Sequence, residues 1–247
     1  MSGHSKWSTI KRAKGAADVK RSATFTKTAN AISIAARLGN SGDPNFNPRL
    51  RMELDAAKKV NMPKENVQRA IDRGLGKLPG QTLEEVTYEG FGPGKVAFYI
   101  QGVTDNRLRT NQEIKHFFDK NGGVLGVPGS TAYMFDKTGE IKVKSKGQSI
   151  DEETLELIDL GANDIEDFED EGNKMYLVYV DSPELNTMST KITQAGYEVE
   201  EAEVIYKPNI VVEIKDEGLA ERVMNFTEKL EEHEDIHKVY ANFDILI

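Results

Sequence analysis

Three short stretches of the chain carry residue types and spacings that could do chemistry. The first, His233-Glu234-Asp235-Ile236-His237, reads H-E-x-x-H. In zinc proteases two histidines one helical turn apart bind the metal, and the glutamate acts as general base. Here the string falls where an expected helix, 217–232, ends, and His237 leads directly into an expected strand. We therefore expect an exposed connection with no bound metal and no catalytic residue; a zinc site is the alternative.

The second stretch, Gly90-Phe91-Gly92-Pro93-Gly94-Lys95, has the glycine content of a phosphate loop. A Walker loop needs a glycine where this chain has Glu89, and a Ser or Thr followed by a helix after the lysine. Lys95 is instead followed by Val96 and a strand pattern. We expect strand–turn–strand, with glycines that permit positive φ; a backbone contact to a ligand is the alternative.

The third stretch, Thr104-Asp105-Asn106-Arg107-Leu108-Arg109-Thr110, lies at a strand-to-helix junction. Thr104, Asp105 or Asn106 can cap the helix. Two arginines in a first turn are unusual, because the helix dipole there favours anions. Arg107 and Arg109 could form a phosphate site with the exposed N–H groups, or could simply be solvated.

The N-terminal segment, residues 1–23, is small, polar and basic, with a single acidic residue, Asp18. This composition is typical of an arm that stays loose until it meets a polyanion. Trp7 could stack on an unpaired base or tuck against the adjoining domain. A solvated tail is the alternative. The expected nucleic-acid-binding residues are His4, Lys6, Trp7, Lys11, Arg12, Lys14, Lys20, Arg21, Lys27, Arg49, Arg51, Arg107 and Arg109.

Charge is segregated along the chain. Residues 1–78 hold 16 Lys/Arg and 6 Asp/Glu, a net +10, and the remaining residues hold 16 and 35, a net −19. The overall −9 thus conceals a basic module, which indicates a polyanionic partner. Cysteine is absent, which excludes disulfides, thiolate metal sites and cysteine nucleophiles. No signal peptide or membrane-spanning window is visible, so we expect a cytoplasmic protein without membrane contact and without a cofactor.

Hydrophobic periodicity predicts an α+β protein. Residues 24–78 contain three short helical patterns, two of them opened by Pro48 and Pro63, and predict a helical bundle. Residues 138–206, with a net charge of −13 from 5 Lys/Arg and 18 Asp/Glu, read β-α-β-β-α-β, the ferredoxin-like order. The flanking segments 83–137 and 207–247 each contain β-α-β and together complete a second unit of that kind.

We therefore expect the acidic domain 138–206 to be inserted into a discontinuous middle domain, 83–137 and 207–247. A linear chain of three domains is the alternative. The pattern predicts strands at 95–103, 131–135, 140–144 and 239–245, and a turn at 136–139.

The quoted motifs, taken together, resemble the YebC family, which includes the mitochondrial translational activator of cytochrome oxidase subunit I. The resemblance runs from residue 2 to 244, in order and with matching spacing. Its shared motif begins at Ser2, which leaves no room for a mitochondrial presequence. The segment 143–203 shows little that matches. The matching residues are 2–21, 25–27, 42–45, 47–51, 61–64, 69–71, 88–94, 104–107, 109–110, 122–123, 134–136 and 242–244.

The resemblance implies three domains and a basic N-terminal helical domain. Members have been called probable transcriptional regulators, and the family is also connected with a ribosome-associated factor that assists the synthesis of proline-rich stretches. We expect a non-enzymatic translation factor that binds the ribosome, or ribosomal or transfer RNA. The alternative is a DNA-binding transcriptional regulator, although no helix shows the Arg/Asn/Gln cluster typical of major-groove readout. An enzyme is the third possibility, with the H-E-x-x-H string as its best case.

Overall fold

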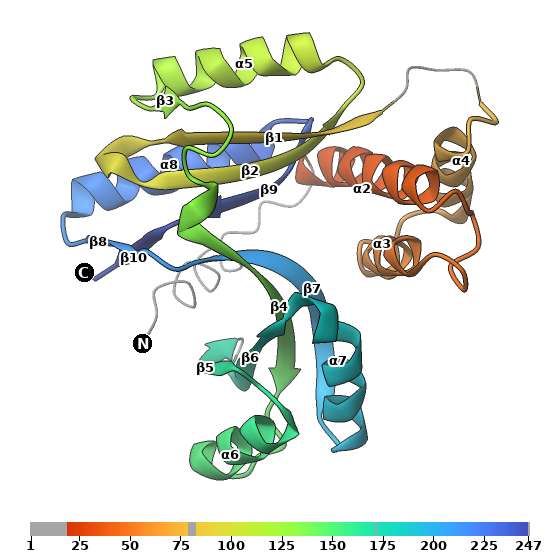
Figure 1. Cartoon of the computed structure of the whole chain (residues 1–247), viewed down its shortest axis with the longest axis vertical. Coiled ribbons are helices and arrows are strands. Elements are labelled where there is room, and N and C mark those ends of the chain that lie inside the picture. Colours follow the sequence, from red (N-terminus) through yellow and green to blue (C-terminus); the bar gives the residue numbers. More distant parts are fainter. Residues whose placement is uncertain (1–18, 79–82, 171, 247) are drawn as a thin grey trace. The chain divides into compact units, whose positions relative to one another are not determined.

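The computed structural model describes residues 19–78, 83–170 and 172–246 (Figure 1). The described residues fall into two compact units, one of 19–132 and 221–241 and the other of 133–220 and 242–246. The fold class is α+β, as expected, with an N-terminal helical domain and two sheet domains. Among the described helices, none is long and apolar enough to cross a membrane.

The helical domain consists of α2 (Val19–Leu38), α3 (Pro48–Lys59) and α4 (Lys64–Gly74), as the three helical patterns predict. Asn47 caps α3 by accepting from Leu50 N at 3.0 Å, and its amide donates to Ala35 O of α2 at 2.8 Å. Helix α2 begins at Val19, so its first residues overlap the segment expected to be a loose arm. The core of the domain is made of Ile32, Ala35, Ala36, Leu50, Ala57, Met62, Ala70 and Ile71.

The middle domain is built on an antiparallel sheet in the order β3-β1-β2-β9. Strands β1 (Glu84–Phe91) and β2 (Ala97–Thr104) form a hairpin, which confirms the strand–turn–strand prediction. The turn, with the 3₁₀ segment η1 (Pro93–Lys95), holds Gly94 at φ 71° and Lys95 at φ 62°, a left-handed conformation that glycine adopts without strain. The outer strands are β3 (Val124–Leu125) and β9 (Ile236–Ala241).

Two helices, α5 (Arg107–Lys120) and α8 (Glu217–Glu232), supply aromatic side chains to the core of this sheet. The ring of Phe226 on α8 lies 4.9 Å from Phe98, 4.9 Å from Phe117 and 5.1 Å from Phe118, measured between centroids. Tilted and edge-on pairs of this kind add to the stabilisation from buried area. These contacts pack α8 against the C-terminal part of α5 and against the sheet.

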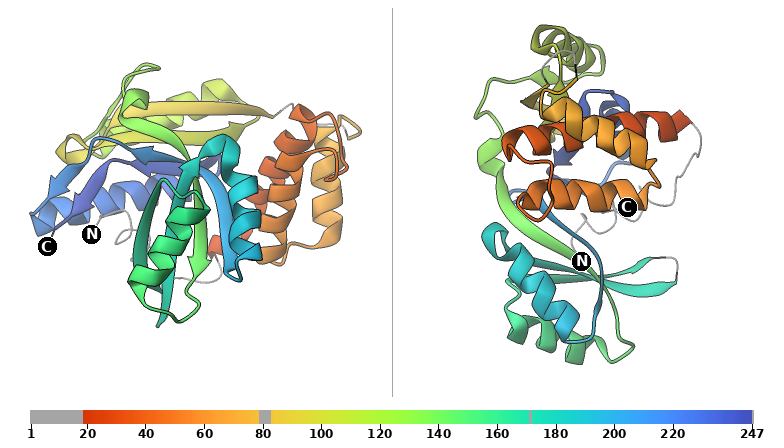
Figure 2. Two further views of the ribbon diagram at one scale, coloured as in Figure 1. Left: turned by 60° about the horizontal axis from the view of Figure 1, so that its bottom comes forward. Right: turned by 90° about the vertical axis from the view of Figure 1, so that its right-hand side faces the viewer.

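The segment expected to form the inserted domain, which we continue to call by that name, has its elements in the predicted order. Strand β4 (Phe135–Lys144), helix α6 (Ile150–Leu160), strands β5 (Asp164–Asp170) and β6 (Asn173–Asp181), the 3₁₀ segment η3 (Ser182–Glu184), helix α7 (Leu185–Gln194) and strand β7 (Glu198–Pro208) succeed one another. The sheet order β5-β6-β4-β7 is that of a ferredoxin-like fold. Helices α6 and α7 lie side by side on one face of the sheet (Figure 2).

One predicted turn and one predicted strand are wrong. The Asp136–Gly139 segment is not a turn but the first half of β4, which runs unbroken to Lys144. Pairing with β7 along the whole of β4, from Phe135 opposite Pro208, outweighs the local turn preference. The strand expected at 131–135 is instead a loop and the 3₁₀ segment η2 (Ala132–Met134) before β4.

The expected strand 239–245 is divided at Asn242. Residues before it pair with β2 as β9, whereas β10 (Phe243–Ile245) pairs in parallel with β8 (Val212–Ile214). Asn242 donates its side-chain amide to Ile210 O at 2.9 Å, and its carbonyl accepts from Val212 N at 2.7 Å. The domain boundaries at 137/138 and 206/207 stay a prediction; β4 and β7 run continuously across them.

Candidate nucleic-acid interface

The expected binding residues are distributed unevenly over the described chain. His4, Lys6, Trp7, Lys11, Arg12 and Lys14 lie outside the described residues. Lys20 and Arg21 belong to the first turns of α2. The rest lie on the helical domain or at the start of α5. Lys27 donates to Glu231 O, Arg49 pairs with Glu85, and Arg51 donates to Pro44 O at 2.9 and 3.1 Å.

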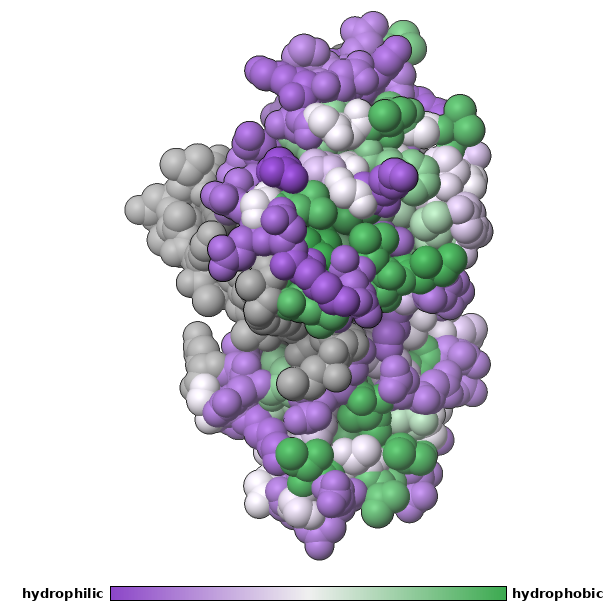
Figure 3. Space-filling model, turned by 90° about the vertical axis from the view of Figure 1, so that its left-hand side faces the viewer, coloured by the Kyte–Doolittle hydropathy of each residue, from purple (hydrophilic) through white to green (hydrophobic). Residues whose placement is uncertain are grey.

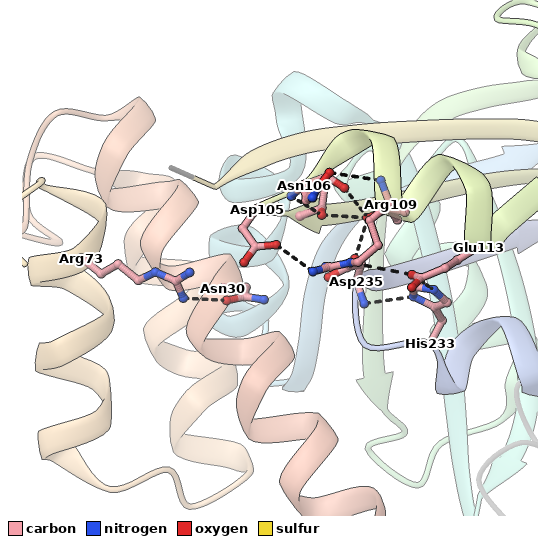
Figure 4. Close-up of polar contacts among 10 residues, drawn as sticks. Asn30, Arg73, Asp105, Asn106, Arg109, Glu113, His233 and Asp235 are labelled. Carbon is pink, nitrogen blue, oxygen red and sulfur yellow. Dashed lines mark hydrogen bonds and ion pairs between the residues drawn. The ribbon is translucent and has the colours of Figure 1, made fainter. Parts of the chain in front are cut away.

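A pocket of about 250 Å³ opens on the helical domain between α2 and α4. Phe25, Arg69 and Arg73 are among the residues that line it. Arg73 is held by Asn30, whose side-chain oxygen accepts from it at 3.3 Å (Figure 4). Within the described residues no carboxylate pairs with Arg69. The pocket is completed by Thr26, Ala29, Ser33, Met62, Asn66 and Ala70.

This grouping places one aromatic residue and two arginines in the lining of the same small pocket. Single-stranded nucleic acids are bound by stacking of bases on aromatic or guanidinium planes, with cations for the phosphates. A second aromatic side chain, Phe46, is 80% exposed in the loop before α3, close in sequence to Arg49 and Arg51. Phe25 also packs against the core of the helical domain. Phe46 could have been found from the sequence, because it is a phenylalanine in the polar loop 39–47.

The arginine-rich junction at the start of α5 is a closed network rather than an open anion site (Figure 4). Asn106 caps the helix by accepting from Arg109 N at 3.1 Å. The guanidinium of Arg109 lies 2.8 Å from Asp235 and 3.2 Å from Asp105. Asp235 also accepts from the hydroxyl of Thr110 at 2.6 Å. These contacts compensate the charge of Arg109 internally.

The electrostatics of this network follow from its geometry. Asp235 is only 5% exposed, and burial alone would raise the pKa of its carboxyl. The hydrogen bonds from Thr110 and Arg109 outweigh that effect and lower the pKa of Asp235. The hydrogen bond to Asp235 likewise raises the pKa of Arg109. The network therefore fastens α5 to the α8–β9 connection, and its phosphate-binding role stays a prediction.

Arg107 differs from Arg109 in having an exposed side chain and, among the described residues, no carboxylate partner. Its neighbour Leu108 is 77% exposed. Hydrophobic residues reach the molecular surface in several places among hydrophilic ones (Figure 3). The start of α5 thus presents one uncompensated cation beside an apolar side chain.

The H-E-x-x-H string does not form the helical pair that a zinc protease requires. His233 follows the end of α8, whereas His237 lies on β9. Ligand atoms of Glu113, His233 and Asp235 do come within 4.8 Å of one another. They satisfy one another instead: His233 Nε2 lies 3.2 Å from Glu113, its Nδ1 accepts from Asp235 N at 3.2 Å, and Arg109 already contacts Asp235. Because a guanidinium stands among them, this donor set fits a divalent cation poorly.

Glu89, which directly precedes the glycine-rich stretch, holds loop 126–132 through its carboxylate. Its carboxylate accepts from the backbone N–H groups of Gly129 at 2.7 Å, Thr131 at 2.7 Å and Ala132 at 2.8 Å. Burial would raise the pKa of Glu89, but these donors outweigh it and lower the pKa. Glu89 thus fastens loop 126–132, and the N–H groups of Thr131 and Ala132, at the start of the strand expected at 131–135, are bound to its carboxylate.

Comparisons with known proteins agree with this architecture. The family described as TACO1/YebC protein N-terminal domain matches residues 5–77, and the one described as TACO1/YebC second and third domain matches residues 83–243. A "probable transcriptional regulatory protein" of Chloroflexus aurantiacus is 46% identical over 99% of this chain and 96% of its own length. A protein of the same description from Persephonella marina is 43% identical with the same coverage.

A solved structure is also similar. The crystal structure of a conserved hypothetical protein from Aquifex aeolicus superposes with a TM-score of 0.82, at 40% identity, over 93% of each chain. The two family matches, at residues 5–77 and 83–243, cover the helical domain and both sheet domains. The chain therefore belongs to the TACO1/YebC family.

Proposed function

We propose that this protein is a non-enzymatic factor that binds single-stranded or irregular RNA of the translation apparatus through its helical domain and basic N-terminal segment. The observation that carries the proposal is the α2–α4 pocket, where Phe25 lies together with Arg69 and Arg73. The charge segregation of the sequence supports it, because residues 1–78 carry a net +10 on a chain of net −9. Assistance to the synthesis of proline-rich stretches is the finer form of this proposal.

The pocket favours an unpaired base over a duplex. Its lining includes Phe25, Met62 and Ala70, and a base that remains stacked in a duplex cannot enter it. The two arginines then reach phosphates on either side of the inserted base. Arg73, fixed by Asn30, is preorganised for this contact, whereas Arg69 is exposed and adaptable.

The chemistry of the described residues favours binding over catalysis. The pocket volume, about 250 Å³, is below the roughly 300–1,000 Å³ typical of sites that enclose a small-molecule substrate. The most enzyme-like cluster, around His233 and Asp235, has its polar atoms engaged with Glu113 and Arg109. Any effect on peptide-bond formation would then come from positioning the reactants.

A DNA-binding transcriptional regulator is the second candidate. The relatives are named probable transcriptional regulatory proteins, which favours it, and α4 presents Gln68 and Arg69 on its exposed side. Against it, Gln68 donates to Asp72 at 3.2 Å and Arg73 is held by Asn30. Major-groove readout needs several such side chains directed at base edges.

Cosedimentation with purified ribosomes in a salt series tests the proposal. The full chain should bind at low salt and dissociate steeply as salt rises. Reversing Lys11, Arg12 and Lys14 to Glu should abolish binding and leave thermal stability unchanged. A matched control reverses three exposed lysines elsewhere, Lys115, Lys120 and Lys137, and should retain most binding.

A third variant, Arg69→Ala with Phe25→Leu, examines the pocket itself, and loss of affinity for a single-stranded RNA oligomer is expected. Selection of duplex DNA from a random pool tests the second candidate, the DNA-binding regulator. Enrichment of one duplex sequence, with no ribosome association at low salt, would replace the RNA factor by the DNA regulator.

A further inference from the structure

The two helices of the inserted domain present different side chains to solvent. Helices α6 and α7 lie side by side on the same face of the sheet (Figure 2). On α7 the exposed side chains are those usual for a helix that packs on a sheet, without a large apolar group. They are Asn186, Thr187, Thr190, Lys191, Thr193 and Gln194. Helix α7 is therefore an internal standard against which α6 can be compared.

Helix α6 exposes two aliphatic side chains on the side that is turned away from the sheet. Leu155 is 62% exposed and Ile158 is 49% exposed. Three positions apart on a helix, they are neighbours on its surface. Leu155 stands opposite Glu153 and Leu157, which are both 0% exposed and face the domain. The packing of the domain therefore does not account for this apolar pair.

Three exposed carboxylates surround the apolar pair. Asp151 and Glu152 precede Leu155 by one turn, and Asp159 follows it by one turn. Among the described residues, Asp151 and Asp159 have no ion-pair partner. We call the five residues Asp151, Glu152, Leu155, Ile158 and Asp159 the α6 surface.

Helix stability explains only part of the acidic rim. Asp151 and Glu152 lie in the first turn, where the helix dipole favours anions, and Glu152 completes a capping box with Ser149. Asp159 lies in the last turn, where the dipole favours cations, and α6 has no basic residue there. A cation brought by a partner would therefore neutralise a charge that opposes the helix dipole.

The charge of the whole domain selects the kind of partner. Residues 138–206 carry a net −13, from 5 Lys/Arg and 18 Asp/Glu. A surface of this sign repels phosphates, which disfavours both nucleic acid and anionic lipid headgroups. Two copies of the chain that met through their α6 surfaces would bring like charges together. A basic protein segment with apolar anchors is complementary to the apolar pair and to its rim.

We propose that the α6 surface docks a basic amphipathic segment of a protein partner and, resting on the proposed function, that this partner is a basic protein of the ribosome. Proteins that lie among RNA carry Lys/Arg-rich segments because these neutralise phosphates. The chain would then recognise two chemically different parts of one target. Its first 78 residues, with a net +10, would bind RNA, and its acidic domain would bind a neighbouring protein.

A synthetic peptide tests the α6 surface separately from the ribosome. The probe is a fluorescent peptide of about 18 residues, with leucines at helical spacing and lysines elsewhere. The full-length variant Leu155→Ser with Ile158→Ser should bind it roughly tenfold more weakly than the wild type, because burial of two aliphatic side chains is lost. A matched control on α7, Thr187→Ser with Thr190→Ser, should bind it as the wild type does. A second peptide with serines in place of the leucines should not distinguish these proteins.

A charge variant keeps the apolar pair and tests the rim. Asp151→Asn with Asp159→Asn leaves the capping box in place and should weaken binding of the leucine peptide by roughly threefold at low salt. Its affinity should also depend less on salt than that of the wild type. All the substituted positions are exposed, so the unfolding temperature should stay unchanged.

Site-specific crosslinking identifies the partner on the ribosome. The chain contains no cysteine, so one introduced cysteine carries a benzophenone label at a single place. Asp151→Cys places the label beside Leu155 and keeps both aliphatic side chains. Thr190→Cys, on the exposed side of α7, is the matched control. Irradiation with purified ribosomes should join the Asp151→Cys protein to a ribosomal protein, and the Thr190→Cys protein much less.

Equal binding of the leucine peptide by the wild type and by the Leu155→Ser, Ile158→Ser variant overturns the docking. A crosslink from Asp151→Cys to RNA or to a second copy of the chain overturns it too. Ribosome association without a protein crosslink from Asp151→Cys also overturns the docking and leaves the proposed RNA binding intact. If no ribosome association occurs but the peptide distinguishes the variants as expected, the docking stands and the proposed function fails.

Discussion

Two glutamates, Glu89 in the middle domain and Glu140 in the inserted domain, stand on central strands of their sheets in opposite electrostatic surroundings. Glu89 meets three backbone N–H donors, and the pKa of its carboxyl is lowered despite burial. Glu140 meets other carboxylates and a tyrosine, and burial raises the pKa of its carboxyl to about 7. Burial penalises both charges, so the difference lies in the donors that the fold supplies.

The contrast separates two uses of acidic residues in one chain. In the middle domain, each of two acidic residues joins segments that are distant in sequence. Glu89 of β1 holds loop 126–132, and Asp235 holds the start of α5 through Arg109. In the inserted domain, Glu140 stands opposite Glu203 of β7, and this repulsion adds to the burial that raises the pKa of Glu140. Protonation of Glu89 is therefore expected to weaken the middle domain in acid, whereas ionisation of Glu140 weakens the inserted domain as the pH rises to neutrality. The lowered pKa values of Glu153 and Glu156 add an acid-sensitive contribution in the inserted domain.

The largest expected effect is that of Glu89→Ala. The change leaves the N–H groups of Gly129, Thr131 and Ala132 without their acceptor and opens the loop that they hold. Unsatisfied buried donors cost about 1–3 kcal/mol each, but the loop can relax towards solvent, so we expect a total loss of about 3–4 kcal/mol. Native-state hydrogen exchange of the β1 and β2 amides measures this loss within the middle domain.

The matched control for this change is Glu85→Ala, on the same strand. Its side chain is 46% exposed and pairs with Arg49 at the surface, so the loss should stay below about 1 kcal/mol. Equal losses for the two variants would show that the loop contacts of Glu89 contribute nothing beyond a surface pair.

The second prediction concerns Glu140 in the other sheet, where the change of stability with pH has the opposite sign to that at Glu89. A carboxyl whose pKa is raised by folding destabilises the fold once it ionises, so stability falls as the pH rises from about 4.5 to about 7. Glu140→Gln removes this charge, and the amides of β4 and β6 should gain a few kcal/mol of protection at pH 8 and none at pH 4. A gain that is the same at both pH values would assign the effect to packing rather than to ionisation.

Local patterns and long-range pairing also differ in how far the sequence predicts them. The alternation of β4 to β7 and the helical patterns of α6 and α7 are local signals, and the ferredoxin-like order of the inserted domain followed from them. The turn at Asp136–Gly139 was wrong because pairing with two neighbouring strands, β6 and β7, decides its conformation. No local signal reports such pairing.

Some features of the candidate site could likewise be predicted from the sequence, and others could not. The basic character of the helical domain and the failure of the H-E-x-x-H string could be seen in the sequence. The pocket beside Phe25 could not, because helical spacing is identical for a core residue and for one that lines a groove. The role of Asp235 was hidden too, since its partners Arg109 and Thr110 lie more than 120 residues away.

A third prediction compares one acidic group in each domain. Asp235→Asn removes the charge that Arg109 and Thr110 contact, at a site that is 5% exposed, and should cost about 2 kcal/mol. Asp170→Asn in the inserted domain should cost less than about 1 kcal/mol, because Lys142 keeps Glu200 at 2.7 Å and one repelling charge is removed. Hydrogen exchange of α5 and of β5 reads the two effects separately, and a larger cost at Asp170 would contradict the distinction between the domains.

The smallest expected effect on stability is that of Arg107→Gln. Comparison with Arg109→Gln distinguishes a structural role from a binding role at the start of α5. Arg107 is exposed and pairs with no described carboxylate, so its loss should change the unfolding free energy by less than about 0.5 kcal/mol. Arg109→Gln should instead cost about 1–2 kcal/mol, because it leaves the buried Asp235 without its cation. If Arg107 contacts phosphate, its loss lowers RNA affinity and reduces the salt slope by about one, whereas Arg109→Gln changes that slope little. If Arg107→Gln leaves the salt dependence of RNA affinity unchanged, the start of α5 has a structural role only. The interface would then be confined to the helical domain and the N-terminal segment.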